Sequence, residues 1–98
     1  MTAHVLALIV DLRIPTSASL KEKRSVINSI TDGARRRFEV ASSETGQQDE
    51  LDLAELTFVA ASGSSGHTVD VIDQVDRFVW SFPEIEVIDG ARHWLEVI

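Results

Sequence analysis

An amphipathic stretch from Ser19 to Phe38 constrains the fold of this chain more than any other segment. Its first residues, Ser19-x-x-Glu22, have the spacing of a capping box, in which two side chains satisfy free amide groups at a helix N-terminus. At about 100° per residue its apolar side chains fall in one broad arc, which predicts a helix packed on a core. The apolar side chains of this arc are Leu20, Val26, Ile27, Ile30, Ala34 and Phe38.

Positive charge is concentrated in the same stretch. Its six basic residues less two acidic ones give a formal charge of +4 in a chain of net charge −7, so the remainder sums to −11. An acidic body argues against a protein that coats nucleic acid with its whole surface, and we expect any contact with phosphate to be local. The expected nucleic-acid-binding residues are Lys21, Lys23, Arg24, Arg35 and Arg36. The alternative is a solvated helix whose last-turn arginines are stabilised by the helix dipole.

Lys23 is the exception on this helix because it falls inside the apolar arc. Its ammonium group must reach past the end of the sheet or meet an acidic group. If the role of Lys23 is structural, we expect Lys23→Met to be nearly neutral or stabilising. A loss of binding at an unchanged melting temperature would instead mark the residue as functional.

Three segments in the first two thirds of the chain are predicted to be strands. Residues 5–12 carry apolar side chains on both alternating faces, which indicates an interior strand. Residues 39–45 are short and polar, as is typical of an edge strand, and residues 54–62 form a second strongly apolar strand.

A second helix is predicted over residues 68–82, where a wide apolar face ends at Pro83. Residues 84–89 and 91–98 predict a last strand, with a bulge or turn at Asp89-Gly90 between them. The element order is therefore β-α-β-β-α-β over a single domain, residues 1–98. Right-handed crossovers of this order predict a ferredoxin-like α+β fold, a four-stranded antiparallel sheet with two helices on one face.

The other face of this sheet is predicted to be open and apolar, because the helices cover only the face of Leu6, Leu8 and Phe58. Such a patch is larger than soluble monomers usually expose, which predicts at least a dimer. Two carboxylates on this face, Asp11 and Glu55, would repel each other, so we expect a cation between them, from Arg13 or from another subunit. The predicted oligomer interface consists of Val5, Ala7, Ile9, Asp11, Arg13, Glu55, Thr57 and Val59.

Residues that carry chemistry do not form a recognisable site. The chain has no cysteine, and its three histidines lack the spacing of a zinc site, so we expect no metal and no cofactor. No nucleophile lies beside a base in a known local pattern, so we expect no enzyme activity. Gly63-x-x-Gly66 could bind an anion on free amides, but a turn with a serine helix cap is the interpretation we favour.

Two further features concern the location of the protein and its surface. The apolar run of residues 5–10 is too short to span a membrane and lacks the basic front and cleavage site of a signal peptide, so we expect a cytoplasmic protein. Trp80 lies off the apolar face of the second predicted helix, and we expect its ring to be exposed.

Three short motifs resemble the YlxP-like family of small bacterial proteins. They are the hexapeptide 19–24 (SLKEKR), the tripeptide 54–56 (AEL) and the closing tetrapeptide 92–95 (RHWL). Genes of that family commonly lie near those for transcription-termination, translation-initiation and ribosome-maturation factors, so the resemblance implies a role around RNA or the ribosome. We therefore expect an accessory protein that contacts phosphate or an acidic partner through its first helix. The alternative is a homo-oligomeric interaction module that uses the open sheet face.

Overall fold

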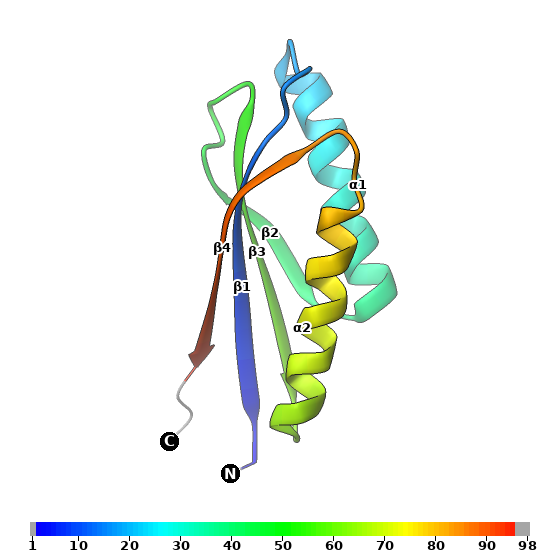
Figure 1. Ribbon diagram of the computed structural model, residues 1–98, viewed down its shortest axis with the longest axis vertical. Coiled ribbons are helices and arrows are strands. Elements are labelled where there is room, and N and C mark those ends of the chain that lie inside the picture. The colour runs from blue at the N-terminus through cyan, green and yellow to red at the C-terminus, as the bar shows by residue number, and fades with distance from the viewer. Residues whose placement is uncertain (1, 96–98) are drawn as a thin grey trace.

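The computed structural model describes residues 2–95 as a four-stranded sheet with two helices on one face (Figure 1). Each strand is antiparallel to its neighbours, in the order β2-β3-β1-β4. This is the predicted ferredoxin-like α+β fold, which is therefore confirmed. The elements are β1 (His4–Arg13), α1 (Leu20–Phe38), β2 (Ala41–Gly46), β3 (Leu53–Ser62), α2 (Ser65–Trp80) and β4 (Glu86–Leu95).

The observed start of β2 and the observed start of α2 differ from the predicted boundaries because of helix caps. β2 begins at Ala41 rather than at Glu39, because Glu39 caps α1 in a left-handed conformation, with φ 57°, and donates its N–H to Arg35 O. α2 begins three residues before the predicted start, because the hydroxyl of Ser64 accepts the N–H of His67. This serine cap is the interpretation favoured for the Gly63-x-x-Gly66 segment.

The predicted bulge in the last strand lies one residue earlier than expected. Asp89 pairs with Asp11 and Val87 pairs with Leu12, so Ile88 is the extra residue. An inserted residue reverses which face the following side chains occupy, because side chains alternate along a strand. The end of the predicted last strand, residues 96–98, lies outside the described residues.

The core lies between the helices and the inner face of the sheet. Leu6, Leu8 and Phe58, predicted to face the helices, are at most 2% exposed. α1 and α2 approach closely, since a Cβ atom added at Gly33 would lie 2.7 Å from Cζ of Phe78. The core is completed by Val10, Leu12, Ile14, Ile27, Ile30, Ala34, Val40, Ala54, Leu56, Ala60, Ile72, Val75 and Val79.

The helix layer does not cover the whole sheet. α2 packs on β1 and β3, and α1 packs beside β2. β4 runs along the edge away from both helices (Figure 1), and its residues from Ile88 to Leu95 are all exposed. No helix within residues 2–95 is long and apolar enough to cross a lipid bilayer.

Candidate nucleic-acid interface

The start of α1 is fixed by the predicted pair of cap contacts. Ser19 is extended, and its Oγ accepts the N–H of Glu22 at 3.1 Å. The carboxylate of Glu22 accepts the N–H of Ala18 at 2.7 Å. Because these contacts define where the helix begins, they also determine which of the following basic residues face the solvent and which face the sheet.

Lys23 is directed into the protein and is 2% exposed. Its Nζ donates to the carbonyl oxygens of Gln47, at 2.6 Å, and Glu50, at 2.7 Å. The third nearby oxygen is Oε2 of Glu44, at 3.0 Å. The two carbonyl oxygens accept two of the three ammonium protons, whereas Glu44 pairs with the charge without a hydrogen bond, so its Oε2 is buried with no hydrogen-bond partner within residues 2–95. Lys23 therefore holds the loop between β2 and β3 against α1, and it is not exposed to a phosphate group.

Arg35 links α1 to the edge of the sheet. One of its Nη atoms donates to Oδ1 of Asp32 at 2.6 Å, and the other donates to the carbonyl oxygen of Ser42 on β2. Its side chain is 47% exposed. Arg35 is thus both a structural contact and part of the solvent-facing surface.

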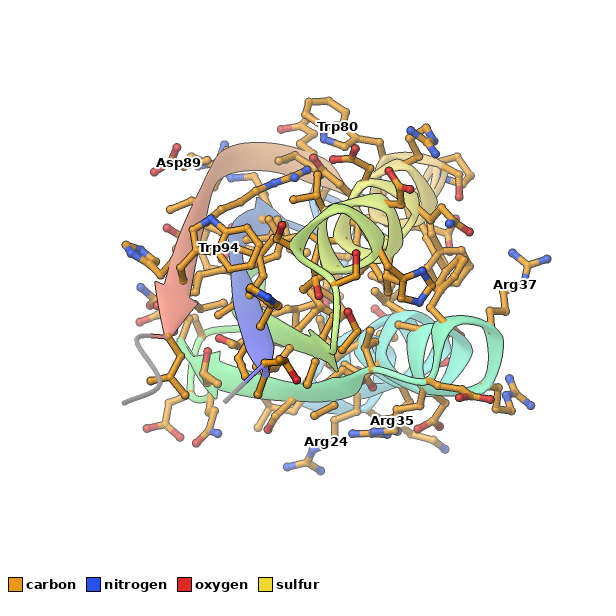
Figure 2. All side chains as sticks on the ribbon, turned by 90° about the horizontal axis from the view of Figure 1, so that it is seen from below. Arg24, Arg35, Arg37, Trp80, Asp89 and Trp94 are labelled. Atoms are coloured by element: carbon orange, nitrogen blue, oxygen red, sulfur yellow. The ribbon has the colours of Figure 1, made fainter. Side chains whose placement is uncertain are left out.

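The remaining three predicted residues, Lys21, Arg24 and Arg36, are exposed and form no ion pair within residues 2–95. They lie within about 120° of the helix circumference and extend along about 22 Å of its axis. Arg24 and Arg35 project from the same side of the molecule in Figure 2. We call the surface formed by Lys21, Arg24, Arg35 and Arg36 the basic face of α1.

Two arginines outside the prediction lie between the helices. Arg37 is placed over the ring of Phe78, with 5.3 Å from its Cζ to the ring centroid. Together with Arg77 it borders a shallow hollow of about 310 Å³. As one of the last-turn arginines of α1, Arg37 is expected from the sequence only to be stabilised by the helix dipole. Its approach to α2 depends on the close packing of the two helices at Gly33, which no sequence pattern indicates.

The predicted oligomer interface is brought together on the open face of the sheet. Ile9 pairs with Thr57 and Ala7 pairs with Val59 across the two central strands. These side chains and Val5 are half-buried, because neighbouring strands shield them. The larger exposed apolar side chains come from β4, where Ile88 is 57% and Leu95 is 63% exposed.

Carboxylates form a row across the same face. The register places Asp11 between Glu55 on β3 and Asp89 on β4. Thr45 donates its hydroxyl to Oε1 of Glu55 at 2.6 Å. Arg13 makes no ion pair within the described residues, so the cation expected from this residue is not in place. A cation from another subunit stays a prediction.

Histidines and carboxylates do not gather into a ligand set in the described part of the chain. Among residues 2–95, no group of three or more histidine, aspartate or glutamate side chains is placed to hold a metal ion.

A groove between α2 and β4 was not predicted from the sequence. We call it the α2–β4 groove; it has a volume of about 240 Å³. Trp80, at the end of α2, is 63% exposed, which confirms the prediction for that ring, and Trp94 on β4 is 50% exposed. Figure 2 shows Trp94 between β4 and α2. The groove is lined by Leu8, Val10, Asp76, Trp80, Val87, Gly90 and Arg92.

Arg92 bridges the two sides of this groove. It donates to Oδ1 of Asp73 at 2.7 Å and lies 3.4 Å from Oδ2 of Asp76. The hydrogen bond to Asp73 raises the pKa of Arg92 above its ordinary value. The sequence signal for this contact is a pair of aspartates at i and i+3 on the helix and a cation on the facing strand. This signal can be recognised only when the register of β4 is known.

Two comparisons with known proteins relate this chain to one family. Residues 5–92 match the model of a family described as "Protein of unknown function (DUF503)". The chain is also 39% identical over 78 residues to the uncharacterized protein YlxP of Bacillus subtilis (strain 168), a match that covers 80% of this chain and 85% of that protein. Two of the motifs that resemble the YlxP-like family, 19–24 and 54–56, lie within the region matched by the family model, and the third, 92–95, begins at its last residue. The chain belongs to the DUF503 family.

Proposed function

We propose that this protein is a cytoplasmic, non-enzymatic accessory protein that binds RNA, alone or within a ribonucleoprotein, through the basic face of α1. The observation that carries the proposal is the set of three exposed cations, Lys21, Arg24 and Arg36, without an ion pair within residues 2–95. The rest of the chain is strongly acidic, so phosphate is attracted to this face and repelled elsewhere.

The proposed contact is with the phosphate backbone rather than with bases. Base-specific recognition by a sheet needs exposed aromatic rings on the central strands. The aromatic ring of β3, Phe58, is fully buried, and the open face carries Thr57 and Val59 in its place. Binding through three cations predicts that log K falls with log salt concentration with a slope of about −2 to −3.

The test is fluorescence anisotropy of a labelled RNA hairpin with the unmodified chain and with Lys21→Glu/Arg24→Glu. We expect the double variant to lose at least about tenfold in affinity, because it reverses two phosphate contacts. The matched control is Arg13→Glu/Arg77→Glu, which changes the net charge equally on other surfaces. Equal loss of affinity in both double variants would refute a role specific to the basic face of α1.

A second candidate function is homo-oligomerisation through the open sheet face. It is favoured by the exposure of Ile88 and Leu95, which extend the half-buried apolar band onto β4. The row of carboxylates that Arg13 does not neutralise also fits a basic group supplied by a second copy.

Light scattering at micromolar concentration tests this second candidate. We expect at least a dimer, which Ile9→Glu and Val59→Glu convert into folded monomers. A monomer mass for the unmodified chain would exclude it.

A further inference from the structure

The α2–β4 groove exists because the helix layer ends before the sheet does. α2 packs mainly on β1 and β3, and it meets the helix-facing side of β4 through side chains, as in the pairs of Arg92 with Asp73 and Asp76. Gly90 widens the groove at its middle, since a Cβ atom at this position would meet no heavy atom within 4 Å. Leu8 and Val10 lie beneath the groove but are at most 2% exposed, so its accessible apolar surface comes from Trp80 and the half-buried Val87.

Both tryptophans of the chain are on this side of the protein. Trp80 borders the groove from α2, and Trp94 lies two residues beyond Arg92 on the same face of β4. Exposed tryptophan rings are uncommon on protein surfaces away from binding sites and are enriched among residues that dominate interfaces. Two such rings beside one groove indicate a contact surface.

The charge of the groove selects the kind of partner. Asp73 and Asp76 carry two negative charges, and Arg92 supplies one positive charge between them. Each carboxylate uses one oxygen on Arg92, so the second oxygen of each makes no hydrogen bond within residues 2–95. The charges of Asp76 and Arg92 balance within the groove lining, and Asp73 beside the groove leaves the group of three net negative, with acceptor atoms available to a further cation.

We propose that the α2–β4 groove binds a basic, extended peptide segment that lies along the free edge of β4 and places an arginine or lysine side chain in the groove. Its aliphatic stem would lie against Val87, and its charged end would lie at Asp76 and against the ring of Trp80. A volume of about 240 Å³ suits one such side chain. β4 is an edge strand, so its outer backbone groups can pair with an added strand.

This surface is separate from the basic face of α1 and has the opposite charge. Nucleic acid is disfavoured here because phosphate groups would approach Asp73 and Asp76. The inference therefore does not depend on the proposed function, and the two can fail independently.

The test is a titration of the chain with a synthetic peptide of alternating arginine and valine, followed by tryptophan fluorescence. We expect the signal of Trp80 and Trp94 to change and to saturate, while a peptide of alternating glutamate and valine has no effect. Asp76→Asn should weaken binding roughly 3- to 10-fold, as expected for one carboxylate contact and an associated cation–π contact at an exposed site. The matched control Asp49→Asn, in the loop between β2 and β3, should bind as the unmodified chain does.

Gly90→Val tests the groove without a change in charge. Its backbone is not in the left-handed region, and a side chain has open space, so the variant should fold normally. The added side chain should fill the groove and abolish the fluorescence change, with an unchanged melting temperature. Lys21→Glu/Arg24→Glu should retain peptide binding.

Three outcomes would overturn the proposal. The first is that the arginine peptide leaves the tryptophan signal unchanged. The second is that a groove variant fails to weaken binding selectively, either because Asp76→Asn and Asp49→Asn weaken it equally or because folded Gly90→Val binds as well as the unmodified chain. The third is that an RNA hairpin displaces the peptide with the same tryptophan response, which would assign the groove to nucleic acid.

Discussion

The two flanks of the sheet use their cations differently. On the β2 flank, Lys23 is 2% exposed, donates to two carbonyl oxygens and pairs with Glu44, and Arg35 reaches the backbone of the edge strand. On the β4 flank, Arg92 links the strand to α2 through two exposed carboxylates. The first flank is closed by α1, whereas the second lies outside the helix layer.

This difference explains why the accessible positive surface lies on α1 and the accessible carboxylates lie beside β4. On the closed flank, carbonyl groups and Glu44 satisfy the inward-facing cation, so the outward-facing cations of α1 remain free. On the open flank no helix covers the strand, and apolar rings and carboxylates stay in contact with water. If this account is right, replacing a cation by methionine should cost most at the buried Lys23, less at Arg35, which contacts the backbone of β2, and least at Arg92, whose partners are exposed carboxylates.

The largest expected effect is at Lys23. Lys23→Met leaves Glu44 and two loop carbonyls without their partner, and we expect a loss of about 3 kcal/mol in the free energy of unfolding. This is the low end of the range for a broken buried ion pair, because Glu44 is 21% exposed. The structure therefore leads us to expect a loss where the position on the helix alone suggested a neutral change.

Urea denaturation measures this loss, and Lys21→Met is the matched control on the exposed side of α1, expected within about 0.5 kcal/mol of the unmodified chain. A variant at Lys23 as stable as the unmodified chain would show that the two flanks do not differ in this way.

A smaller effect is expected at Arg35. Arg35→Met removes the hydrogen bond to Ser42 O and the ion pair with Asp32, which should cost about 1 kcal/mol because the side chain is half exposed. Arg36→Met, on the next residue, should leave stability unchanged. Thermal denaturation of the two variants side by side separates the structural arginine from the free one, and equal melting temperatures would contradict the assignment.

The smallest effect is expected at Arg92. Arg92→Met should cost less than about 1 kcal/mol, since both ion pairs are exposed at the surface. High salt should reduce the difference from the unmodified chain further by screening the pairs. Denaturation at low and high salt checks this, with Arg13→Met as the control. A loss greater than that of Lys23→Met would reverse the comparison between the flanks.

Local patterns predicted the fold because each element carries its own signal. The Ser19–Glu22 capping box and the alternation along β1 and β3 are readable without tertiary information. The odd placement of Lys23 was also readable, but its partners were not. They are 24 and 27 residues away, at carbonyl oxygens whose direction depends on the left-handed backbone of Gln47, with φ 61°.

The α2–β4 groove was not predicted because of a single inserted residue. If β4 alternated regularly from Val87, Ala91 and His93 would face the helices. The bulge at Ile88 instead places Arg92 and Trp94 on that side. The sequence indicates that Gly90 permits an irregularity nearby, but it does not specify which residue is inserted.

The lack of cover over β4 has a consequence for the order in which the native structure opens. A strand whose side chains are exposed from Ile88 to Leu95 is attached to β1 mainly by backbone hydrogen bonds. Its amide protons should exchange with solvent more readily than those of β3, which is held by the core. Opening of β4 alone would expose the second edge of β1 while the two helices, β2 and β3 stay packed. Such an opening would produce a native substate with an unpaired central strand, available for pairing with another chain without global unfolding.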